Sequence, residues 1–342
     1  MKYAVGLYGG SFNPLHLGHV DCIIRAASQC GELFVVLSVG TKRREIPARV
    51  RYRWLYTITK HIGNVKILML EDDAETKEAY AGDCWMRDAE KVKAQICKPI
   101  DAVFCGSDYD ENSFWSVCYP DSELVSFPRN GISSTELRND LYGHWEWLPT
   151  AVRPYFVKKV LLIGTESTGK SVLTINLAHR FATNYLEEAG RGISERSGTD
   201  TLMLPSDFTE ILLRQKLNEI EALAHSNRVL FEDTDALVTL FYMGFLNDVE
   251  IVRNSALAEA IDALNKYDLI LFMEPDVPFV QDGDRRIEQQ QDREACTRRL
   301  KELLTRSGKP FHVLRGDYRE RYEKAVALTE RMLAPGRADS IC

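Results

Sequence analysis

The chain is predicted to be an α/β protein built from two doubly wound parallel-sheet domains in series. Its 342 residues suit two domains of roughly 150 to 190 residues each. Apolar runs of strand length alternate with amphipathic helical stretches in both halves, which is typical of parallel sheets covered by helices. A glycine-containing motif follows the first strand of each half, where such sheets bind phosphate groups.

Apolar runs mark the predicted strands of both halves. They are Ala4–Leu7, Leu33–Val39, Lys66–Leu70, Ala102–Cys105 and Leu124–Phe127 in the first half, and Val160–Ile163, Arg228–Phe231, Leu269–Met273 and Phe311–Leu314 in the second. Helices such as 206–224 and 292–307 separate the later strands. Each half therefore has enough strands for its own sheet.

The segment Trp145–Pro154 is the predicted junction between the domains. It contains two prolines, which limit helix formation, and three large apolar residues that can pack against a domain. It has neither glycine nor serine, so a flexible linker is not expected. The boundary is placed near residue 153, with one domain at 1–153 and the other at 154–342.

Composition and charge exclude several classes of protein. A net charge of −7 argues against a general nucleic-acid-binding surface, which would be basic. The longest apolar runs are far shorter than the roughly 20 residues of a membrane span, and the N-terminus lacks the features of a secretory signal. The eight cysteines show no zinc-site spacing and are interpreted as thiols in a reducing compartment. A cytoplasmic protein with small-molecule partners is expected, and whether it forms a homo-oligomer is left open.

The first candidate site is the string GGSFNPLHLGH at residues 9–19, between the first strand and a helix that begins near Gly18. Glycines allow backbone amides to approach a ligand, and a helix N-terminus favours bound phosphate. His16 and His19 are spaced to present ring nitrogens to the α- or β-phosphate of a nucleotide. The candidate residues of this string are Gly9, Gly10, Ser11, Phe12, Asn13, His16, Gly18 and His19.

A second string, ISSTELR at residues 132–138, looks like the start of a capped helix, because serines precede a glutamate as in a capping box. Alone it predicts only a cap. Together the two strings resemble the HxGH nucleotidyltransferases, in which substrate phosphate attacks the α-phosphorus of a nucleoside triphosphate in line and pyrophosphate leaves. The resemblance implies that the β- and γ-phosphates of ATP are held by Ser133, Ser134, Thr135 and Arg138.

Other residues near the first site have two interpretations each. Gly106 and Asp108 follow the fourth strand, where the superfamily binds adenine and ribose, although they also suit a plain turn. Trp85 is a candidate to stack on the acceptor heterocycle, with Asn13 as a second acceptor contact, and core packing of the tryptophan is the alternative. The basic residues 42–44 suit either a phosphate contact or a solvated loop.

The second candidate site is the string GTESTGKS at residues 164–171, which fits the phosphate-binding pattern G-x-x-x-x-G-K-S. A predicted strand precedes it and the helical stretch 172–181 follows it, as the pattern requires. Loop amides surround the β-phosphate, Lys170 bridges the β- and γ-phosphates, and the Ser171 hydroxyl binds Mg²⁺. The candidate ATP contacts are Gly164, Thr165, Glu166, Ser167, Thr168, Gly169, Lys170 and Ser171.

Charged residues beyond the loop complete the second site. Asp233 is the candidate to hold Mg²⁺ or to accept a proton, and Asp235 either shares that site or caps the next helix. Glu188 is a candidate for binding ribose hydroxyls or for taking the 5′ proton of a nucleoside acceptor, with Arg191 beside it. A further set suits a lid that neutralises the transferring phosphoryl group, with surface exposure as the alternative, and comprises Arg285, Arg286, Arg293 and Arg298.

The order of these motifs resembles one family, the NadR-type nicotinamide-nucleotide adenylyltransferases fused to ribosylnicotinamide kinase. The junction 145–157 and the strings EDTD at 232–235 and PFVQDGDR at 278–285 extend the resemblance over nearly the whole chain. It implies that the kinase half phosphorylates nicotinamide riboside to NMN, and that the first half joins NMN to AMP from ATP, giving NAD and pyrophosphate. ATP would be a substrate of both halves, with Mg²⁺ as the cofactor.

The sequence departs from the family pattern in ways that bear on specificity. Residues 9–14 are closer to the nicotinate mononucleotide adenylyltransferases, so the choice between amide and acid base stays open. Residues 192–194 replace the family's usual aromatic and acidic continuation. The chain starts directly before its first strand, whereas some members carry an N-terminal helix-turn-helix, so direct repression of transcription is not expected. The alternatives are a partner-binding nucleotide sensor with one degenerate site and an enzyme with another small acceptor, such as phosphopantetheine.

Overall fold

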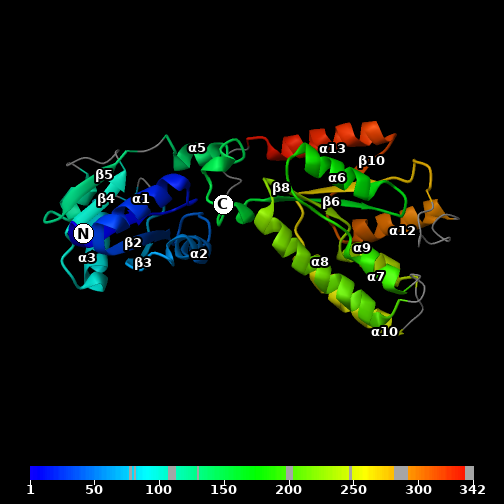
Figure 1. Cartoon of the computed structure of the whole chain (residues 1–342), viewed down its shortest axis with the longest axis horizontal. Coiled ribbons are helices and arrows are strands. Elements are labelled where there is room, and N and C mark those ends of the chain that lie inside the picture. Colours follow the sequence, from blue (N-terminus) through cyan, green and yellow to red (C-terminus); the bar gives the residue numbers. More distant parts are fainter. Residues whose placement is uncertain are drawn as a thin grey trace. The chain divides into compact units, whose positions relative to one another are not determined.

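The computed structural model describes residues 1–76, 79–80, 82–106, 113–128, 131–197, 203–245, 249–280 and 292–335. Within this part the chain divides into two compact units, Met1–Val152 and Arg153–Ala334 (Figure 1). Each unit is built on a parallel sheet of five strands, so the predicted fold class is confirmed. No helix among the described residues combines the length and apolar character needed to cross a membrane.

The first unit has the strand order β3-β2-β1-β4-β5, with every neighbouring pair parallel. The strands are β1 (Tyr3–Gly10), β2 (Cys30–Gly40), β3 (Val65–Asp72), β4 (Ala102–Gly106) and β5 (Glu123–Phe127). They cover all five predicted strands and extend beyond them, because hydrogen bonds to a neighbouring strand continue past the apolar run. The central strand β1 lies where the strand order reverses, and open α/β sheets bind ligands at the carboxyl end of this position.

The helices of the first unit each bury apolar side chains. They are α1 (Leu17–Gln29), α2 (Ala48–Thr59), α3 (Asp83–Ile96), α4 (Phe114–Cys118) and α5 (Ser134–Asn139). One core cluster joins Val5, Leu7 and Val36 of the central strands to Val92 and Ile96 of α3. The predicted junction also packs: Trp145 is 1% exposed, and Leu148 and Val152 are fully buried.

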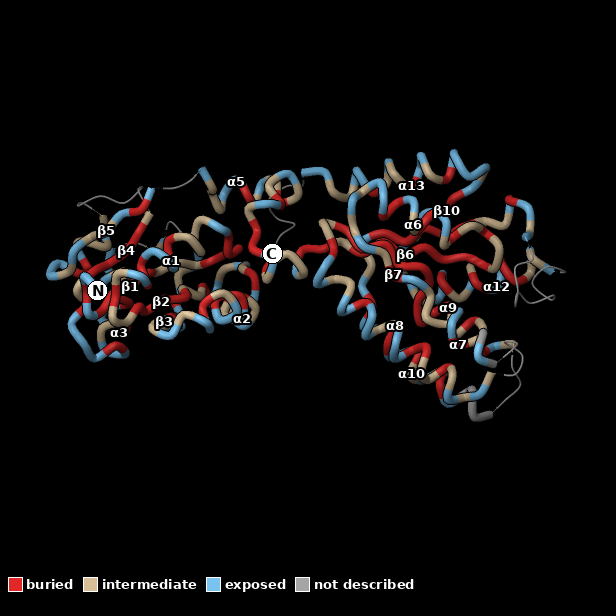
Figure 2. Tube along the Cα trace, viewed as in Figure 1, coloured by how far each residue is buried: buried red, intermediate tan, exposed pale blue. Residues whose placement is uncertain are grey.

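The second unit has the strand order β10-β9-β6-β8-β7, again all parallel. The strands are β6 (Lys158–Gly164), β7 (Tyr185–Leu186), β8 (Val229–Asp233), β9 (Leu269–Met273) and β10 (His312–Leu314). Figure 2 shows the central strands as buried along almost their whole length. The edge strand β7 has only two residues, which is too short to give a strand signal in the sequence.

Helices cover both faces of the second sheet. They are α6 (Lys170–Arg180), α7 (Ala189–Ser197), α8 (Pro205–His225), α9 (Ala236–Met243), α10 (Val249–Leu264), α12 (Arg293–Arg306) and α13 (Tyr318–Leu333). Alternate residues of β6 point to opposite faces, so Val160 and Leu162 pack with α6 and α13, whereas Leu161 and Ile163 pack with α9 and α12. The loop between β6 and α6 thus starts from a rigid central strand.

Candidate active sites

The first site is a cavity of about 380 Å³ in the first unit, at the carboxyl ends of β1 and β4. It brings both predicted strings together, although they are more than 100 residues apart in the sequence. The predicted residues that line it are Gly9, Gly10, Ser11, His16, Gly18, His19, Gly106, Ser133, Ser134, Thr135 and Arg138. Asp108 lies outside the described residues.

The two histidines are fixed by reciprocal hydrogen bonds at the start of α1. The backbone N–H of His19 donates to Nδ1 of His16 at 3.3 Å, and the N–H of His16 donates to Nδ1 of His19 at 3.4 Å. The rings stack with centroids 3.6 Å apart. Because Nδ1 accepts in both rings, each neutral imidazole carries its proton on Nε2, which can donate to a phosphate oxygen.

Hydrogen bonds tie the second string to the first. Nε2 of His16 lies 2.9 Å from Oγ of Ser134, and Nη1 of Arg138 donates to the carbonyl of Asn13 at 2.9 Å. Ser133 is the N-cap of α5, since its Oγ accepts from the N–H of Thr135 at 3.2 Å and of Glu136 at 3.4 Å. The predicted cap is therefore present, and it lies in the wall of the cavity.

Close packing explains two features of the glycine string. A Cβ on Gly9 would come within 2.6 Å of the Trp115 ring, so a larger residue there would require the ring to move. Phe12 is fully buried with φ +46°, and its ring meets the His19 ring edge to face at 5.1 Å. Trp115 lines the cavity and was missed by the sequence analysis, because an aromatic residue in a short helix carries no motif of its own.

The two predicted acceptor residues are not among the described residues that line the cavity. Asn13 is 5% exposed, and its Oδ1 accepts from the N–H of Ile46 at 3.1 Å. Trp85 is partly buried and packs against the core, and its ring stacks on Phe114 with the ring centroids 5.5 Å apart. Core packing, the alternative for Trp85, is what the geometry shows, and a contact with the acceptor stays a prediction.

A buried arginine that the sequence analysis missed supports the glycine string. Arg51 on α2 is 1% exposed and donates to the carbonyls of Ser11, at 2.5 Å, and Ser38, at 3.1 Å. Among the basic residues 42–44, Arg43 is held by both carboxylate oxygens of Asp72 at 2.6 Å. The pKa of the Arg43 guanidinium is raised, mainly because of this hydrogen bond to the Asp72 carboxylate. Arg43 is thus a structural cation within its own unit.

The second site is the phosphate-binding loop Gly164–Ser171 between β6 and α6, in the context that the sequence predicted. Positive φ angles of +57° at Ser167 and +84° at Gly169 give the loop its curvature. Lys170 is 9% exposed and its Nζ donates to the carbonyl of Thr165 at 3.0 Å. The hydroxyl of Ser171 donates to Oδ2 of Asp233 at 2.5 Å.

Charged groups gather around the Ser171 hydroxyl. Asp233 is the last residue of β8, and Arg191 on α7 donates to Oγ of Ser171 at 3.3 Å. Removal from water and the Asp233 charge raise the pKa of Glu188, while Lys170 and Arg191 act in the opposite direction. The five residues on which the predicted phosphoryl transfer depends are therefore close together.

Two other predicted residues have different surroundings. Asp235 is 3% exposed, and its Oδ1 caps α9 by accepting from the N–H of Leu237 at 3.0 Å, which is one of its two predicted roles. Burial, as the largest cause, raises the pKa of Asp235 to about 6. A nucleoside contact of Asp235 stays a prediction. Arg285 lies outside the described residues.

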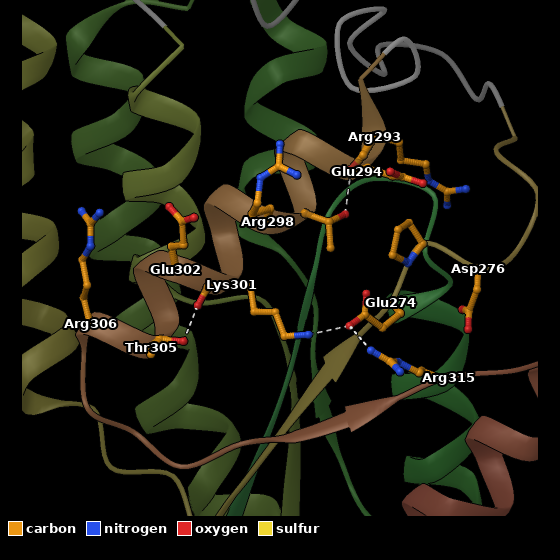
Figure 3. A pocket seen from close by; sticks show the side chains of 12 residues that line it. Glu274, Asp276, Arg293, Glu294, Arg298, Lys301, Glu302, Thr305, Arg306 and Arg315 are labelled. Atoms are coloured by element: carbon orange, nitrogen blue, oxygen red, sulfur yellow. Dashed lines mark hydrogen bonds and ion pairs between the residues drawn. The ribbon is translucent and has the colours of Figure 1, made fainter.

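A groove of about 1040 Å³ runs along α12 near the ends of β9 and β10 (Figure 3). Its floor is the Glu274 carboxylate, which accepts from Lys301 at 2.6 Å and lies 3.5 Å from the Arg315 guanidinium. Arg298 lines this groove. Arg293 donates to backbone carbonyls, those of Val277 at 2.5 Å and Ser167 at 2.9 Å, and its service in a lid stays a prediction.

Two family models match the chain, one described as cytidylyltransferase-like over residues 7–140 and one described as an AAA domain over residues 159–321. The trifunctional NAD biosynthesis/regulator protein NadR of Escherichia coli (strain K12) is 28% identical over 98% of this chain and 85% of that protein. A phosphopantetheine adenylyltransferase of Synechococcus sp. (strain WH7803) is 42% identical over 19% of this chain and 40% of that protein. A solved structure of a NadR protein in complex with NR has a TM-score of 0.78 at 23% identity, over 97% of this chain and 96% of that one.

The fold and the two sites define a two-domain transferase, with a nucleotidyltransferase half followed by a P-loop kinase half. The likeness to the Escherichia coli relative continues through both halves and the junction between them. Over nearly its whole length the chain is similar to the NadR proteins of Escherichia coli and Salmonella typhimurium, at 28% identity.

Proposed function

We propose that this chain makes NAD from nicotinamide riboside in two steps. The second site transfers the γ-phosphoryl group of ATP to the riboside and gives NMN, and the first site joins NMN to the AMP part of a second ATP. The observation that carries the proposal is the presence, in one NadR-type chain, of two phosphate sites whose charged residues lie together. The cytoplasm, which supplies ATP, is the expected location.

In the first half, the phosphate oxygen of NMN attacks the α-phosphorus of ATP, the bond to the β-phosphate oxygen breaks, and pyrophosphate leaves. Donors on one face of the cavity, Nε2–H of His16 and of His19, would neutralise charge that develops on the phosphate oxygens. Arg138 and the serines of α5 would hold the leaving pyrophosphate. Trp115 offers a flat surface in the cavity for the base of the acceptor.

In the kinase half, Lys170 would leave the Thr165 carbonyl and bridge the β- and γ-phosphates. Glu188, with its raised pKa, would take the proton from the 5′ hydroxyl as that oxygen bonds to the γ-phosphorus and ADP leaves. Arg191 lies close enough to Ser171 to add positive charge at the transferring group.

The residues of the second site fit a magnesium ion. Oδ1 of Asp233 is buried and has no hydrogen-bond partner among the described residues, and its Oδ2 accepts from the Ser171 hydroxyl. Mg²⁺ prefers oxygen ligands and usually takes only one or two from protein, with phosphates and water completing the shell. Ser171 and Asp233 would hold the ion, which would neutralise charge on the ATP phosphates.

The test is to incubate the whole chain with nicotinamide riboside, ATP and Mg²⁺ and to follow the products by mass spectrometry. NMN should appear first and NAD, with pyrophosphate, should follow. Formation of neither product would refute the proposal. Parallel reactions with NMN and nicotinate mononucleotide would measure which base the first site prefers.

A second candidate for the first half is adenylyl transfer to phosphopantetheine. The observation that favours it is the local identity of 36 to 42% with phosphopantetheine adenylyltransferases, over segments of 66 to 74 residues. These segments cover about a fifth of this chain, whereas the NadR relatives match nearly all of it. The test compares the rates of pyrophosphate release with the two acceptors. A faster rate with phosphopantetheine than with NMN would support this candidate.

A further inference from the structure

The carbonyl oxygens of the phosphate-binding loop accept hydrogen bonds from an arginine on α13. Arg321 is 1% exposed, and its Nη1 donates to the carbonyl of Thr168 at 2.7 Å. Its other nitrogens donate to the carbonyls of Glu274 and Gly316, each at 2.9 Å. One guanidinium therefore joins the loop to the ends of β9 and β10.

A second arginine, on the helix α12, makes the same kind of contact one residue earlier. Nη2 of Arg293 donates to the carbonyl of Ser167 at 2.9 Å, and Nη1 donates to the carbonyl of Val277 at 2.5 Å. Figure 3 shows Arg293 at the end of the groove along α12. Desolvation lowers the pKa of both guanidiniums, so each is a positive charge taken partly out of water. Both bind backbone oxygens, and Arg321 also pairs with the Asp276 carboxylate.

These contacts fix the direction of two consecutive amide groups. In a trans peptide the C=O and N–H bonds point in opposite directions. The peptides that begin at Ser167 and Thr168 have their carbonyls turned toward the guanidiniums, so the N–H groups of Thr168 and Gly169 point to the other side. The positive φ angles at Ser167 and Gly169 are those of an anion-binding nest of amides.

The charge of the arginines adds to this geometric effect. A guanidinium that binds a peptide oxygen polarises the amide and makes its N–H a stronger donor. Both arginines bind carbonyl oxygens of the loop, whereas phosphate would meet its N–H groups. They differ in this way from Lys170, which is expected to touch phosphate directly.

We propose that Arg293 and Arg321 are positioning residues that hold the phosphate-binding loop in the conformation that presents its amides to the β-phosphate of ATP. The proposal rests on the kinase half of the proposed function only in requiring that the loop bind a nucleoside triphosphate. It does not depend on which nucleoside accepts the phosphoryl group.

The test compares inhibition of the kinase reaction by ADP and by adenosine in the wild-type chain and in variants. Arg321→Met should raise the inhibition constant of ADP and the KM for ATP about tenfold, the effect expected from losing a hydrogen bond to a charged group. The inhibition constant of adenosine, which has no phosphate, and the KM for the riboside should change less than about twofold. Arg321→Lys should recover part of the loss, because one ammonium group can still reach a carbonyl.

Arg319→Met is the matched control, since this exposed arginine on the same helix pairs only with Glu323 among the contacts described. It should leave both inhibition constants and the adenylyltransferase rate unchanged. If Arg321→Met does not fold, Arg293→Met and Arg321→Lys carry the same test. The proposal would be overturned if inhibition by ADP and inhibition by adenosine weakened equally, or if neither weakened. A wild-type chain that ADP does not inhibit would instead count against the kinase function itself.

Discussion

Burial and neighbouring charge decide what each carboxylate of the second unit can do. Glu188 lies near Lys170, Arg191 and Asp233, and its pKa is raised by removal from water and by the Asp233 charge. Asp235 is buried, and its carboxylate accepts a hydrogen bond from the first turn of α9. The first can exchange a proton beside an acceptor, whereas the second stabilises a helix.

Glu188→Gln should remove the acid limb from the pH profile of riboside phosphorylation. A base with a raised pKa is deprotonated only at a higher pH than an ordinary glutamate, so the wild-type rate falls as the pH falls through that raised pKa. Glutamine cannot take the 5′ proton, so the rate should drop about a hundredfold and lose this dependence. The measurement is kcat/KM for the riboside between about pH 5 and pH 8.

Glu187→Gln is the control for this prediction, because Glu187 is the exposed neighbour in the sequence. It should keep both the rate and the acid limb. A Glu188→Gln variant that retains the acid limb would show that another group takes the proton.

Sequence motifs predicted the candidate residues for phosphate contact but not the residues that support them. His16, His19, Lys170 and Ser171 belong to spaced patterns, and the structure places each in its expected site. Arg321 belongs to no pattern, because its partner Thr168 is 153 residues away in the sequence. Such support depends on tertiary contacts, which a single sequence does not display.

At the scale of elements, apolar runs predicted where strands lie better than where they end. Strand β9 has the predicted bounds, whereas β1 and β2 continue into residues whose place in the sheet depends on the neighbouring strand.

The helix α5 was predicted from its serine cap, and Ser133 does cap it. The family resemblance also implies that Ser133 contacts ATP, and this stays a prediction that the position of Ser133 in the cavity wall makes testable.

Ser133→Ala should raise the KM for ATP in adenylyl transfer about fivefold, because a lost N-cap costs about 1 kcal/mol and loosens the short helix that carries Ser134 and Arg138. Ser133→Asp restores a good N-cap but places a carboxylate in the wall of a phosphate cavity. It should therefore bind ATP no better than the alanine variant. The measurement is the steady-state KM for ATP. If the aspartate variant recovers the wild-type value, Ser133 acts only as a cap.

Gln215 on α8 connects the two segments that carry Glu188 and Asp233. Its Oε1 accepts from the N–H of Ala189 at 3.0 Å, and its Nε2 donates to the carbonyl of Thr234 at 3.4 Å. Thr234 directly follows β8 and has φ +66°, an uncommon conformation for a β-branched residue. The glutamine therefore sets the separation of the candidate base and the candidate magnesium ligand.

Gln215→Leu should raise the KM for the riboside about tenfold with little change in the KM for ATP, because two hydrogen bonds on the acceptor side are lost. Gln215→Glu keeps the acceptor for the Ala189 N–H, so its KM for the riboside should rise less. Adenylyl transfer by the same chain is the internal control. A raised KM for ATP with an unchanged KM for the riboside would contradict this role.

At the scale of the whole chain, each unit has its own sheet, its own core clusters and its own phosphate site. The described contacts of His19 lie within the first unit, and those of Lys170 lie within the second. Removing a functional group from one site should therefore leave the packing of the other unit unchanged. In the proposed function NMN links the two reactions, as the product of one and the substrate of the other.

This independence predicts that two damaged chains can complement each other. His19→Ala should lower adenylyl transfer about a hundredfold or more and spare the kinase, and Lys170→Ala should do the reverse, as expected when a group that stabilises transition-state charge is removed. Neither variant alone should convert nicotinamide riboside to NAD at an appreciable rate. An equimolar mixture should form NAD after a lag, because NMN released by the His19→Ala variant reaches the intact adenylyltransferase site of the Lys170→Ala variant.

The double variant is the control and should make neither product. A single substitution that lowers both activities would show that the sites are coupled, and a mixture that accumulates NMN without NAD would show that free NMN does not enter the first site.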